Sequence, residues 1–308
     1  MNIVFDIYYF LYKNIWKKLG ISRGQGFLLD FFLTVVGRSN SEYSIRISDG
    51  RIFRGDLWNI RYRALFWYRT HEPIETLLFK NLVRSGDVVL DVGANIGWYT
   101  TLAGELVGSG KVYAFEPVDI VASELQKNVN LNQLTNVTVQ QIALSDRSGF
   151  GHIWFAVEDW GLSSLIQRNP LKSIKHSIEL QTLDDWVKEN RMKTITFIKC
   201  DIEGAETLFL KGGMTTLQRF QPLIMMELNA PTLNNFGLQV DELLKIFFEL
   251  GYGVYAIQPN PNNNIVFTKL GVKSHIMMQV NILAVPEGNK ELYDRFVGVI
   301  ECCDSTRT

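Results

Sequence analysis

The sequence predicts an α/β protein with a mostly parallel sheet and helices on both faces, and three observations support this fold class. Short apolar runs alternate with helical patterns through short links, which is typical of a parallel sheet. A turn with two glycines follows one of these apolar runs and leads into a helix. The chain has 308 residues, of which 46% are hydrophobic, so it can bury a substantial core in one large domain.

The first 71 residues are predicted to form a small module of helices and a β-hairpin. Two apolar stretches, residues 3–11 and 27–36, each contain an aspartate and are shorter than the roughly 20 residues of a membrane-spanning helix. We expect both to be helices that pack on the main domain or on another subunit. Peripheral contact with a membrane surface is the alternative.

The remainder of this module predicts a hairpin and a further helix. Residues 44–54 have the pattern of a β-hairpin, with Asp49-Gly50 suited to a type I′ turn. Residues 61–71 interleave aromatic and basic side chains, which could stack on nucleic-acid bases. The balance of 31 Lys and Arg against 32 Asp and Glu favours instead a helix with a buried apolar face. The buried positions would be Tyr62, Leu65 and Phe66.

Residues 86–117 predict a strand, a glycine turn, a helix and a second strand that ends in an acid, and a helix over 74–83 leads into them. Asp91 stands at the carboxyl end of the first strand, where open α/β sheets bind ligands. Gly93 and Gly97 permit a tight turn and a close approach of the backbone to a ligand. A helix follows over 99–107, and the second strand, 112–115, ends at Glu116. Glu116 lies 19 residues after Gly97, where an acid can accept hydrogen bonds from two ribose hydroxyls.

The turn favours a nucleoside that carries an amino acid over a dinucleotide. Its glycines follow the pattern G-x-x-x-G and not G-x-G-x-x-G, so the usual cradle for a pyrophosphate is missing. Asp91 would repel a phosphate beside this loop, but it would attract an ammonium group. S-adenosylmethionine fits this description. The alternatives are an NAD-dependent oxidoreductase and a noncatalytic binding protein that retains the fold.

The alternation continues with a helix over 123–132 and a third strand over 137–144. The turn after this strand would lie beside the adenine of a nucleotide, which makes Ala143 and Asp146 candidates for contacting it. Asp146 is equally suited to stabilising a turn. Residues 149–181 are predicted to be irregular or antiparallel, with strand pieces at 153–157 and 178–180 around a polar loop.

Acidic residues follow the fourth parallel strand, over 196–200, which comes after a helix that Thr182 is suited to cap. Three carboxylates stand within six residues in the segment DIEGAE, from Asp201 to Glu206. Strand alternation places Lys199 and Asp201 on one side, and Glu203 joins them if the extended geometry continues. We predict catalytic roles for Lys199, Asp201 and Glu203, and a solvated position near the start of a helix for Glu206.

A fifth strand over 222–228 presents Glu227 and Asn229 near the same edge of the sheet. Together with Asp201 they could bind Mg²⁺, because hard cations favour carboxylate and amide oxygens. No closed ligand set is visible in the sequence, so no metal is assigned. The sheet is completed by a helix over 240–250, a strand over 252–257, a loop over 259–264 and a strand over 281–285.

These segments resemble the FkbM-type family of S-adenosylmethionine-dependent methyltransferases. The matching elements, between about Glu72 and Asn229, are VVLDVGANIGWYTTLAG, VYAFEP, NVNLN, ALSD, TLDDW, FIKCDIEGAETLFLKGG and PLIMMEL. The resemblance implies a Rossmann-like class I methyltransferase fold with a seven-stranded sheet. It also implies O-methylation of a sugar, glycolipid or secondary metabolite. The cofactor contacts it implies are Asp91, Gly93, Asn95, Gly97 and Glu116, and we add Ala94 and Pro117 from the same motifs.

The predicted reaction is in-line attack of an acceptor oxygen on the sulfonium methyl group, which releases S-adenosylhomocysteine. The donor is already activated by its positive sulfur, so the protein mainly supplies alignment. Asp201 or Glu203 is placed to take the hydroxyl proton.

The predicted organisation is the module over 1–71, a methyltransferase domain over 72–290 and a C-terminal tail over 291–308. A net charge of −1 gives no reason to expect a nucleic-acid partner, so the expected acceptor is a small-molecule or glycan hydroxyl. The three cysteines show no C-x-x-C spacing and predict neither a zinc site nor a disulfide framework. A cytoplasmic location follows, while membrane association and oligomer formation stay open.

Overall fold

The computed structural model of the chain describes residues 42–156, 173–259, 265–272, 274 and 276–305. The predicted helices over 3–11 and 27–36, the polar loop after β7 and most of the loop over 259–264 lie outside these residues. The chain divides between His71 and Glu72 into two compact units. None of the helices in the described ranges combines the length and the apolar character needed to cross a membrane.

The described part of the first unit is a hairpin followed by a helix. Strands β1 (Glu42–Arg46) and β2 (Ile52–Asp56) pair antiparallel, and α3 (Ile60–Tyr68) follows. Tyr62, Leu65 and Phe66 are buried, as predicted.

The turn of this hairpin differs from the predicted type I′ turn. Ile47 N–H donates to the Arg51 carbonyl at 3.0 Å, which leaves a three-residue loop of Ser48, Asp49 and Gly50. Gly50 has a φ of 98°, whereas Asp49 is not among the residues with positive φ. A type I′ turn needs positive φ at both central residues, so the loop instead takes the three-residue form that ends in glycine.

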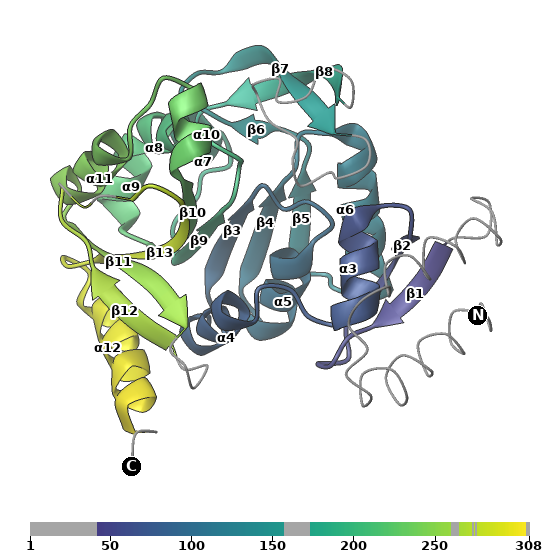
Figure 1. The fold of residues 1–308 in the computed structure, drawn as a ribbon, viewed down its shortest axis with the longest axis horizontal. Helices are drawn as coiled ribbons and strands as arrows, with labels where there is room; N and C mark the ends of the chain where they lie inside the picture. The colour runs from purple at the N-terminus through teal and green to yellow at the C-terminus, as the bar shows by residue number, and fades with distance from the viewer. Residues whose placement is uncertain (1–41, 157–172, 260–264, 273, 275, 306–308) are drawn as a thin grey trace. The chain divides into compact units, whose positions relative to one another are not determined.

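The second unit is built on an eight-stranded sheet with helices on both faces (Figure 1). The strands, in the order in which they lie side by side, are β12 (Ile265–Lys269), β11 (Tyr252–Pro259), β13 (Gln279–Pro286), β10 (Leu223–Asn229), β9 (Phe197–Cys200), β3 (Val88–Val92), β4 (Lys111–Phe115) and β5 (Val137–Gln140). The five strands from β10 to β5 are parallel to one another. β13 runs antiparallel between β10 and β11.

Two groups of helices cover the sheet. Neighbouring helices in the first group are α12 (Lys290–Ser305), α4 (Pro73–Leu82), α5 (Trp98–Leu106) and α6 (Asp119–Leu131). The second group contains α7 (Leu183–Glu189), α8 (Glu206–Gly212), α9 (Met214–Phe220) and α11 (Val240–Glu249), and the short α10 (Ala230–Asn235) follows β10.

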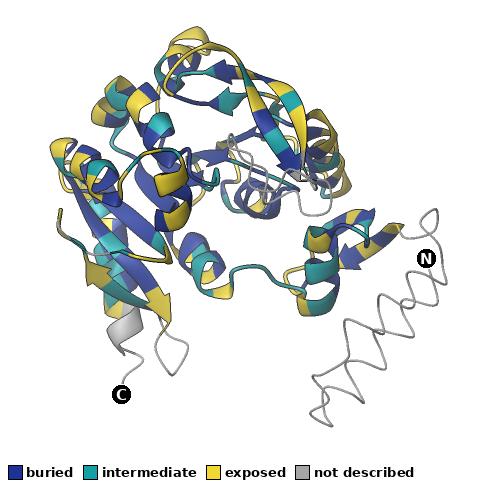
Figure 2. Cartoon of the chain, turned by 45° about the horizontal axis from the view of Figure 1, so that its top comes forward, coloured by how far each residue is buried: buried dark blue, intermediate teal, exposed yellow. Residues whose placement is uncertain are grey.

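The core is divided between the two faces of the sheet because successive side chains of a strand alternate. Phe115 of β4 packs in the larger cluster, where its ring and that of Tyr113 meet Trp186 edge-on at centroid distances of 5.0 Å. Ala114, the residue between them, packs on the other face with Leu125 of α6. Figure 2 shows the strands of the large sheet as mostly buried and the helices as exposed along their outer sides.

Two predicted strands differ from the structure. The third predicted strand, 137–144, is broken: β5 ends at Gln140, and β6 (Ala143–Leu144) pairs with β8 (Ser173–Gln181) in a separate three-stranded sheet with β7 (Gly149–Ala156). Residues 141 and 142 bend the chain out of the large sheet. The sequence also missed β12, which adds an edge strand to the seven expected strands.

The C-terminal segment is part of the second unit, whereas the sequence predicted a separate tail after residue 290. α12 buries Leu292, Phe296 and Val299. Arg295 is 9% exposed, and its Nη1 donates to both carboxylate oxygens of Asp87 at 2.7 and 2.9 Å. An ion pair between the last helix and the residue before β3 therefore fixes the C-terminal segment.

Arg295→Met is expected to lower the free energy of unfolding by roughly 3–5 kcal/mol, because it leaves the buried Asp87 carboxylate without its charged partner. Lys290→Met is the matched control on the same helix. It removes an exposed pair with Asp294 and should cost less than about 1 kcal/mol. Urea denaturation measures both values, and equal losses would contradict a structural role for the Arg295 pair.

Candidate active site

The turn after β3 requires glycine because two backbone segments touch there. Gly93 has a φ of 83°, and a Cβ on it would lie 2.0 Å from the carbonyl oxygen of Asp201, at the end of β9. The N–H groups of Gly93 and Ala94 both donate to the Phe115 carbonyl at 3.0 Å. The ends of β3, β4 and β9 are thereby joined at the predicted cofactor turn. At the far side of the turn, Gly97 is the N-cap residue of α5 and has a φ of 91°.

Glu116 supports this turn from the end of β4. Its Oε2 accepts a hydrogen bond from Asn95 N–H at 3.1 Å, and its Oε1 accepts one from Val118 N–H at 3.1 Å. Asn95 has a φ of 50°, and its own side chain accepts from Ile96 N–H at 2.8 Å. Burial raises the pKa of Glu116 to about 7, and the two backbone hydrogen bonds offset only part of this effect. The acid thus orders the turn and keeps lone pairs for a ligand.

Asp91 lies buried at the end of β3, as its place in the sequence predicted. It is 3% exposed, and the Thr100 hydroxyl of α5 donates to its Oδ2. Burial raises the pKa of Asp91 to about 6, while the hydrogen bond from Thr100 and the charge of Lys199 oppose the rise. A buried carboxylate with one hydroxyl partner is suited to receiving a cationic group.

The remaining predicted cofactor residues are Pro117, Ala143 and Asp146. Pro117 directly follows Glu116 and is half-buried. Glu116 N–H donates to the Gln140 carbonyl at 3.0 Å, which brings the end of β5 to this edge three residues before Ala143. Ala143 itself belongs to β6, and Asp146 is exposed and accepts from the Ser145 hydroxyl at 3.2 Å.

Lys199 and Asp201 lie on the same side of the chain, as strand alternation predicted. The Lys199 Nζ stands 3.7 Å from Asp201 Oδ2, and the two side chains are 2% and 30% exposed. The ammonium group lies 5.2 Å from the centre of the Tyr99 ring. Burial by itself would lower the pKa of Lys199, but the carboxylates around it, Asp201 first, outweigh burial and raise it. Lys199 is therefore a fixed positive charge beside a partly accessible carboxylate.

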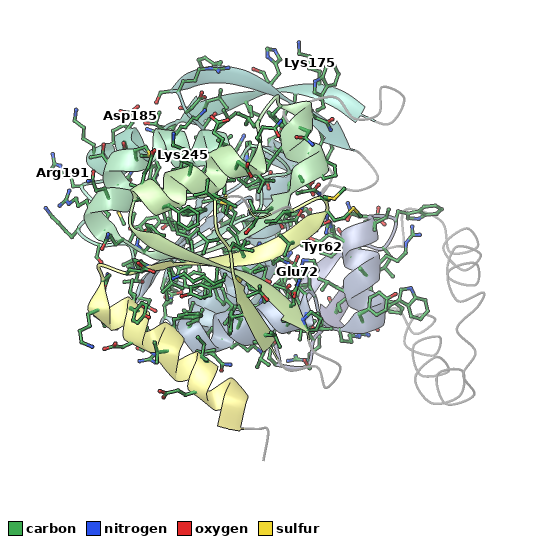
Figure 3. All side chains as sticks on the ribbon, turned by 60° about the vertical axis from the view of Figure 1, so that its left-hand side comes forward. Tyr62, Glu72, Lys175, Asp185, Arg191 and Lys245 are labelled. Atoms are coloured by element: carbon green, nitrogen blue, oxygen red, sulfur yellow. The ribbon has the colours of Figure 1, made fainter. Side chains whose placement is uncertain are left out.

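Two further acids meet at this point. Glu227, at the end of β10, is 7% exposed, and its Oε2 accepts from Gln279 Nε2 of β13 at 2.7 Å. Glu72, just before α4, has a φ of 42°, and its Oε2 accepts from the Tyr99 hydroxyl at 2.7 Å. Glu72, Asp201 and Glu227 each offer a carboxylate oxygen within 4.8 Å of those of the other two. These three residues are called the acid cluster below, and Figure 3 labels Glu72.

The sequence did not single out Glu72 or Tyr99 as site residues. Glu72 precedes a proline, a position that disfavours helical φ and ψ, and this was the one available local signal of an unusual conformation. Nothing in the apolar helix pattern around Tyr99 indicated that its hydroxyl would reach an acid 27 positions earlier.

Three predictions at this edge need correction. Glu203 has a φ of 55°, so the extended geometry ends before it and strand alternation does not place it beside Lys199. Glu206 was predicted to be solvated, but it is 1% exposed, and its Oε1 accepts from the N–H groups of Ile202 and Gly204. Asn229 was grouped with possible Mg²⁺ ligands, but its side chain accepts from Thr232 N–H and caps α10.

The sheet is doubly wound, with a glycine turn after its first strand, an acid after the second and charged residues after the fourth. These features define a class of protein, the α/β enzymes that bind a nucleoside-containing cofactor. The chain belongs to the FkbM methyltransferase family, because the model of the methyltransferase FkbM domain matches residues 91–254, more than half of its length. S-adenosylmethionine is accordingly the cofactor of this domain.

Two curated relatives and one solved structure are each similar to part of the chain. 2-O-methyltransferase NoeI of Sinorhizobium fredii (strain NBRC 101917 / NGR234) is 29% identical over 167 residues, 49% of this chain and 65% of its own length. Methyltransferase sdnD of Sordaria araneosa is 27% identical over 42% of this chain and 61% of its own length. The chain thus spans less than two thirds of either relative. The crystal structure of methyltransferase FkbM from Methylobacillus flagellatus KT is similar with a TM-score of 0.42 and 20% identity, over 71% of this chain and 49% of that one.

We expect the affinity for S-adenosylhomocysteine to fall about tenfold between pH 8 and pH 6 if the ribose hydroxyls donate to Glu116. Such donors favour the ionised carboxylate, and the pKa of Glu116 in the free protein is about 7. Protonation below this value therefore competes with binding, whereas above it the full affinity is available. Calorimetric titration at both pH values measures the change. Glu116→Gln should bind weakly and should keep only the smaller change between pH 6 and 8 that arises from Asp91, whose pKa is about 6. An equal affinity of the wild type at both values would contradict the predicted contact.

Proposed function

We propose that the protein is an S-adenosylmethionine-dependent O-methyltransferase whose acceptor is a hydroxyl group of a sugar-containing molecule. The observation that carries the proposal is the direct backbone contact between the cofactor turn and the charged residues after β9. Gly93 and the Asp201 carbonyl touch, and Asp201 N–H donates to the Val92 carbonyl at 2.9 Å. A methyl group presented at the turn is therefore close to the Asp201 carboxylate.

The family and its relatives support the chemistry. The chain belongs to the FkbM methyltransferase family, and NoeI is named as a 2-O-methyltransferase. Carboxylates that accept hydrogen bonds also suit an acceptor with several hydroxyl groups. Sugars, glycolipids and hydroxylated secondary metabolites all have this property. We place the acceptor among the sugar-containing molecules because these carry several neighbouring hydroxyl groups.

The proposed mechanism is a direct displacement. The acceptor oxygen attacks the methyl carbon in line with the departing sulfur, so an O–C bond forms while the S–C bond breaks and leaves its electron pair on sulfur. Asp201 accepts the hydroxyl proton as the new bond forms, which is general base catalysis. Lys199 Nζ lies 3.7 Å from Asp201 Oδ2, and its positive charge stabilises the negative charge that develops on the acceptor oxygen as the proton leaves. Alignment of donor and acceptor supplies much of the rate enhancement.

The test uses S-adenosylmethionine with a labelled methyl group. The purified chain is incubated with oligosaccharides, glycolipids and small alcohols, and the label is followed into each acceptor. Transfer to a sugar hydroxyl, giving an ether that survives mild alkali, is the expected result. Transfer only to amine-bearing acceptors, or to none of the hydroxyl compounds by a protein that binds S-adenosylhomocysteine, would contradict the proposal.

A further inference from the structure

We propose that the acid cluster of Glu72, Asp201 and Glu227 is a binding site for one divalent, oxygen-preferring cation next to the acceptor. This inference deepens the proposed function and rests on it for the cation's role, since the cation would hold the acceptor oxygen. The site uses residues from three separate parts of the fold: the start of α4, the end of β9 and the end of β10.

The first argument is the geometry of the three carboxylates. Their oxygens lie within 4.8 Å of one another, although like charges at such a distance repel. Ca²⁺ binds oxygens at about 2.3–2.6 Å and Mg²⁺ at about 2.0–2.1 Å, so one cation can contact all three after at most a small inward movement. Glu227 is buried, and Glu72 and Asp201 are half-buried. Their arrangement leaves positions open for waters and for an acceptor oxygen.

The second argument is that two of the carboxylates are held by neighbours. The Tyr99 hydroxyl donates to Glu72, and the Gln279 amide donates to Glu227. Hydrogen bonds of this kind orient metal ligands and are a regular part of metal sites. The neighbours come from α5 and β13, so the cluster is fixed by the packed sheet and its helices.

The third argument is independent of the acids and concerns Lys199. Its side chain is 2% exposed and points toward Asp201, yet Nζ makes no hydrogen bond with any residue in the described parts of the chain. A buried ammonium group with three unused donors calls for an oxygen ligand. A water or an acceptor hydroxyl bound to the cation would supply that oxygen.

A simple ion pair with Lys199 does not account for the acid cluster. One ammonium group faces Asp201, Glu72, Glu227 and Asp91, all of which act on it electrostatically. The nearest carboxylate, that of Asp201, is 3.7 Å away. The three acids instead gather near one another, which is the arrangement expected around a second positive charge.

The experiment measures Mn²⁺ binding to the full chain after treatment with a chelator, using the electron paramagnetic resonance signal of free Mn²⁺. We expect one saturable site per chain and a higher midpoint of thermal unfolding with Mn²⁺. Glu72→Gln and Glu227→Gln should each weaken binding at least tenfold. Glu242→Gln, which removes an exposed partner of Lys211, should leave it unchanged.

Titration with S-adenosylhomocysteine in the absence of metal separates this inference from the proposed function. Retained cofactor binding in Glu227→Gln shows that the variant is folded. The cation site would be overturned by the absence of saturable Mn²⁺ binding to the wild type at millimolar concentration. It would also be overturned if both cluster variants bound Mn²⁺ with the affinity of the wild type. Mn²⁺ binding to the wild type and its effect on the midpoint of thermal unfolding test the cation site even if a variant fails to fold. Failure of methyl transfer by a protein that does bind Mn²⁺ would count against the O-methyltransferase proposal alone.

Discussion

Replacing Gly93 with alanine should abolish measurable binding of S-adenosylhomocysteine and lower the free energy of unfolding by roughly 2–5 kcal/mol. The added Cβ would lie 2.0 Å from the Asp201 carbonyl oxygen, and that atom belongs to the backbone and cannot rotate away. The ends of β3 and β9 would have to separate. A φ of 83° adds a further penalty for a residue with a side chain.

Gly86→Ala provides a matched control for this substitution. Gly86 precedes the same strand and has a φ of 89°, but a Cβ on it would meet no atom within 4 Å. It should therefore show only the conformational penalty of about 1–2 kcal/mol and should bind S-adenosylhomocysteine normally. Chemical denaturation and calorimetry give the two quantities. If both variants lose the same stability and keep their affinity, the close approach at Gly93 has no functional importance.

Asp201→Asn is expected to lower the rate of methyl transfer by about 10²–10⁴-fold while the affinity for S-adenosylhomocysteine stays nearly constant. Asparagine has almost the same shape but cannot accept the hydroxyl proton, and it removes the negative charge beside Lys199. Cofactor affinity is spared because only the backbone of Asp201 meets the turn at Gly93.

Single-turnover measurements with saturating Mg²⁺ report this rate without interference from cation binding. Glu249→Gln is the control, because it removes the acid of an exposed ion pair. The distance from Lys245 Nζ to Glu249 Oε1 is 3.7 Å, the same as that from Lys199 Nζ to Asp201 Oδ2. Unchanged turnover in Asp201→Asn would remove this residue from the mechanism. A parallel loss of cofactor affinity would assign it to the cofactor site instead.

The sequence predicted those parts of the site that depend on local pattern. Strand alternation and the rule that ligands bind at the carboxyl ends of parallel strands were enough to place Asp91 and to put Lys199 and Asp201 on one side. The spacing between the glycine turn and Glu116 was enough to bring that acid to the turn, where it accepts from Asn95 N–H.

The parts that could not be predicted depend on contacts between distant segments. Glu72 belongs to the acid cluster because α4 and α5 pack together and its carboxylate reaches Tyr99. The buried carboxylate of Glu206 is hydrogen-bonded because the backbone turns at Glu203 and brings the N–H groups of Ile202 and Gly204 within reach of it. Neither the contact of Glu72 nor the burial of Glu206 can be recognised from the spacing of apolar residues in the sequence, since each depends on one particular backbone conformation.

The position of β13 has a consequence for the synthesis of the protein. β13 lies between β10 and β11 but is made after both of them, so these two strands leave the ribosome with their shared neighbour still missing. Until residues 279–286 emerge, each presents an open strand edge to other chains. The Gln279 amide that holds Glu227 arrives with the same strand. The acid cluster is therefore completed only after β13 has been made, and a nascent chain that stalls before residue 279 exposes two edges prone to aggregation.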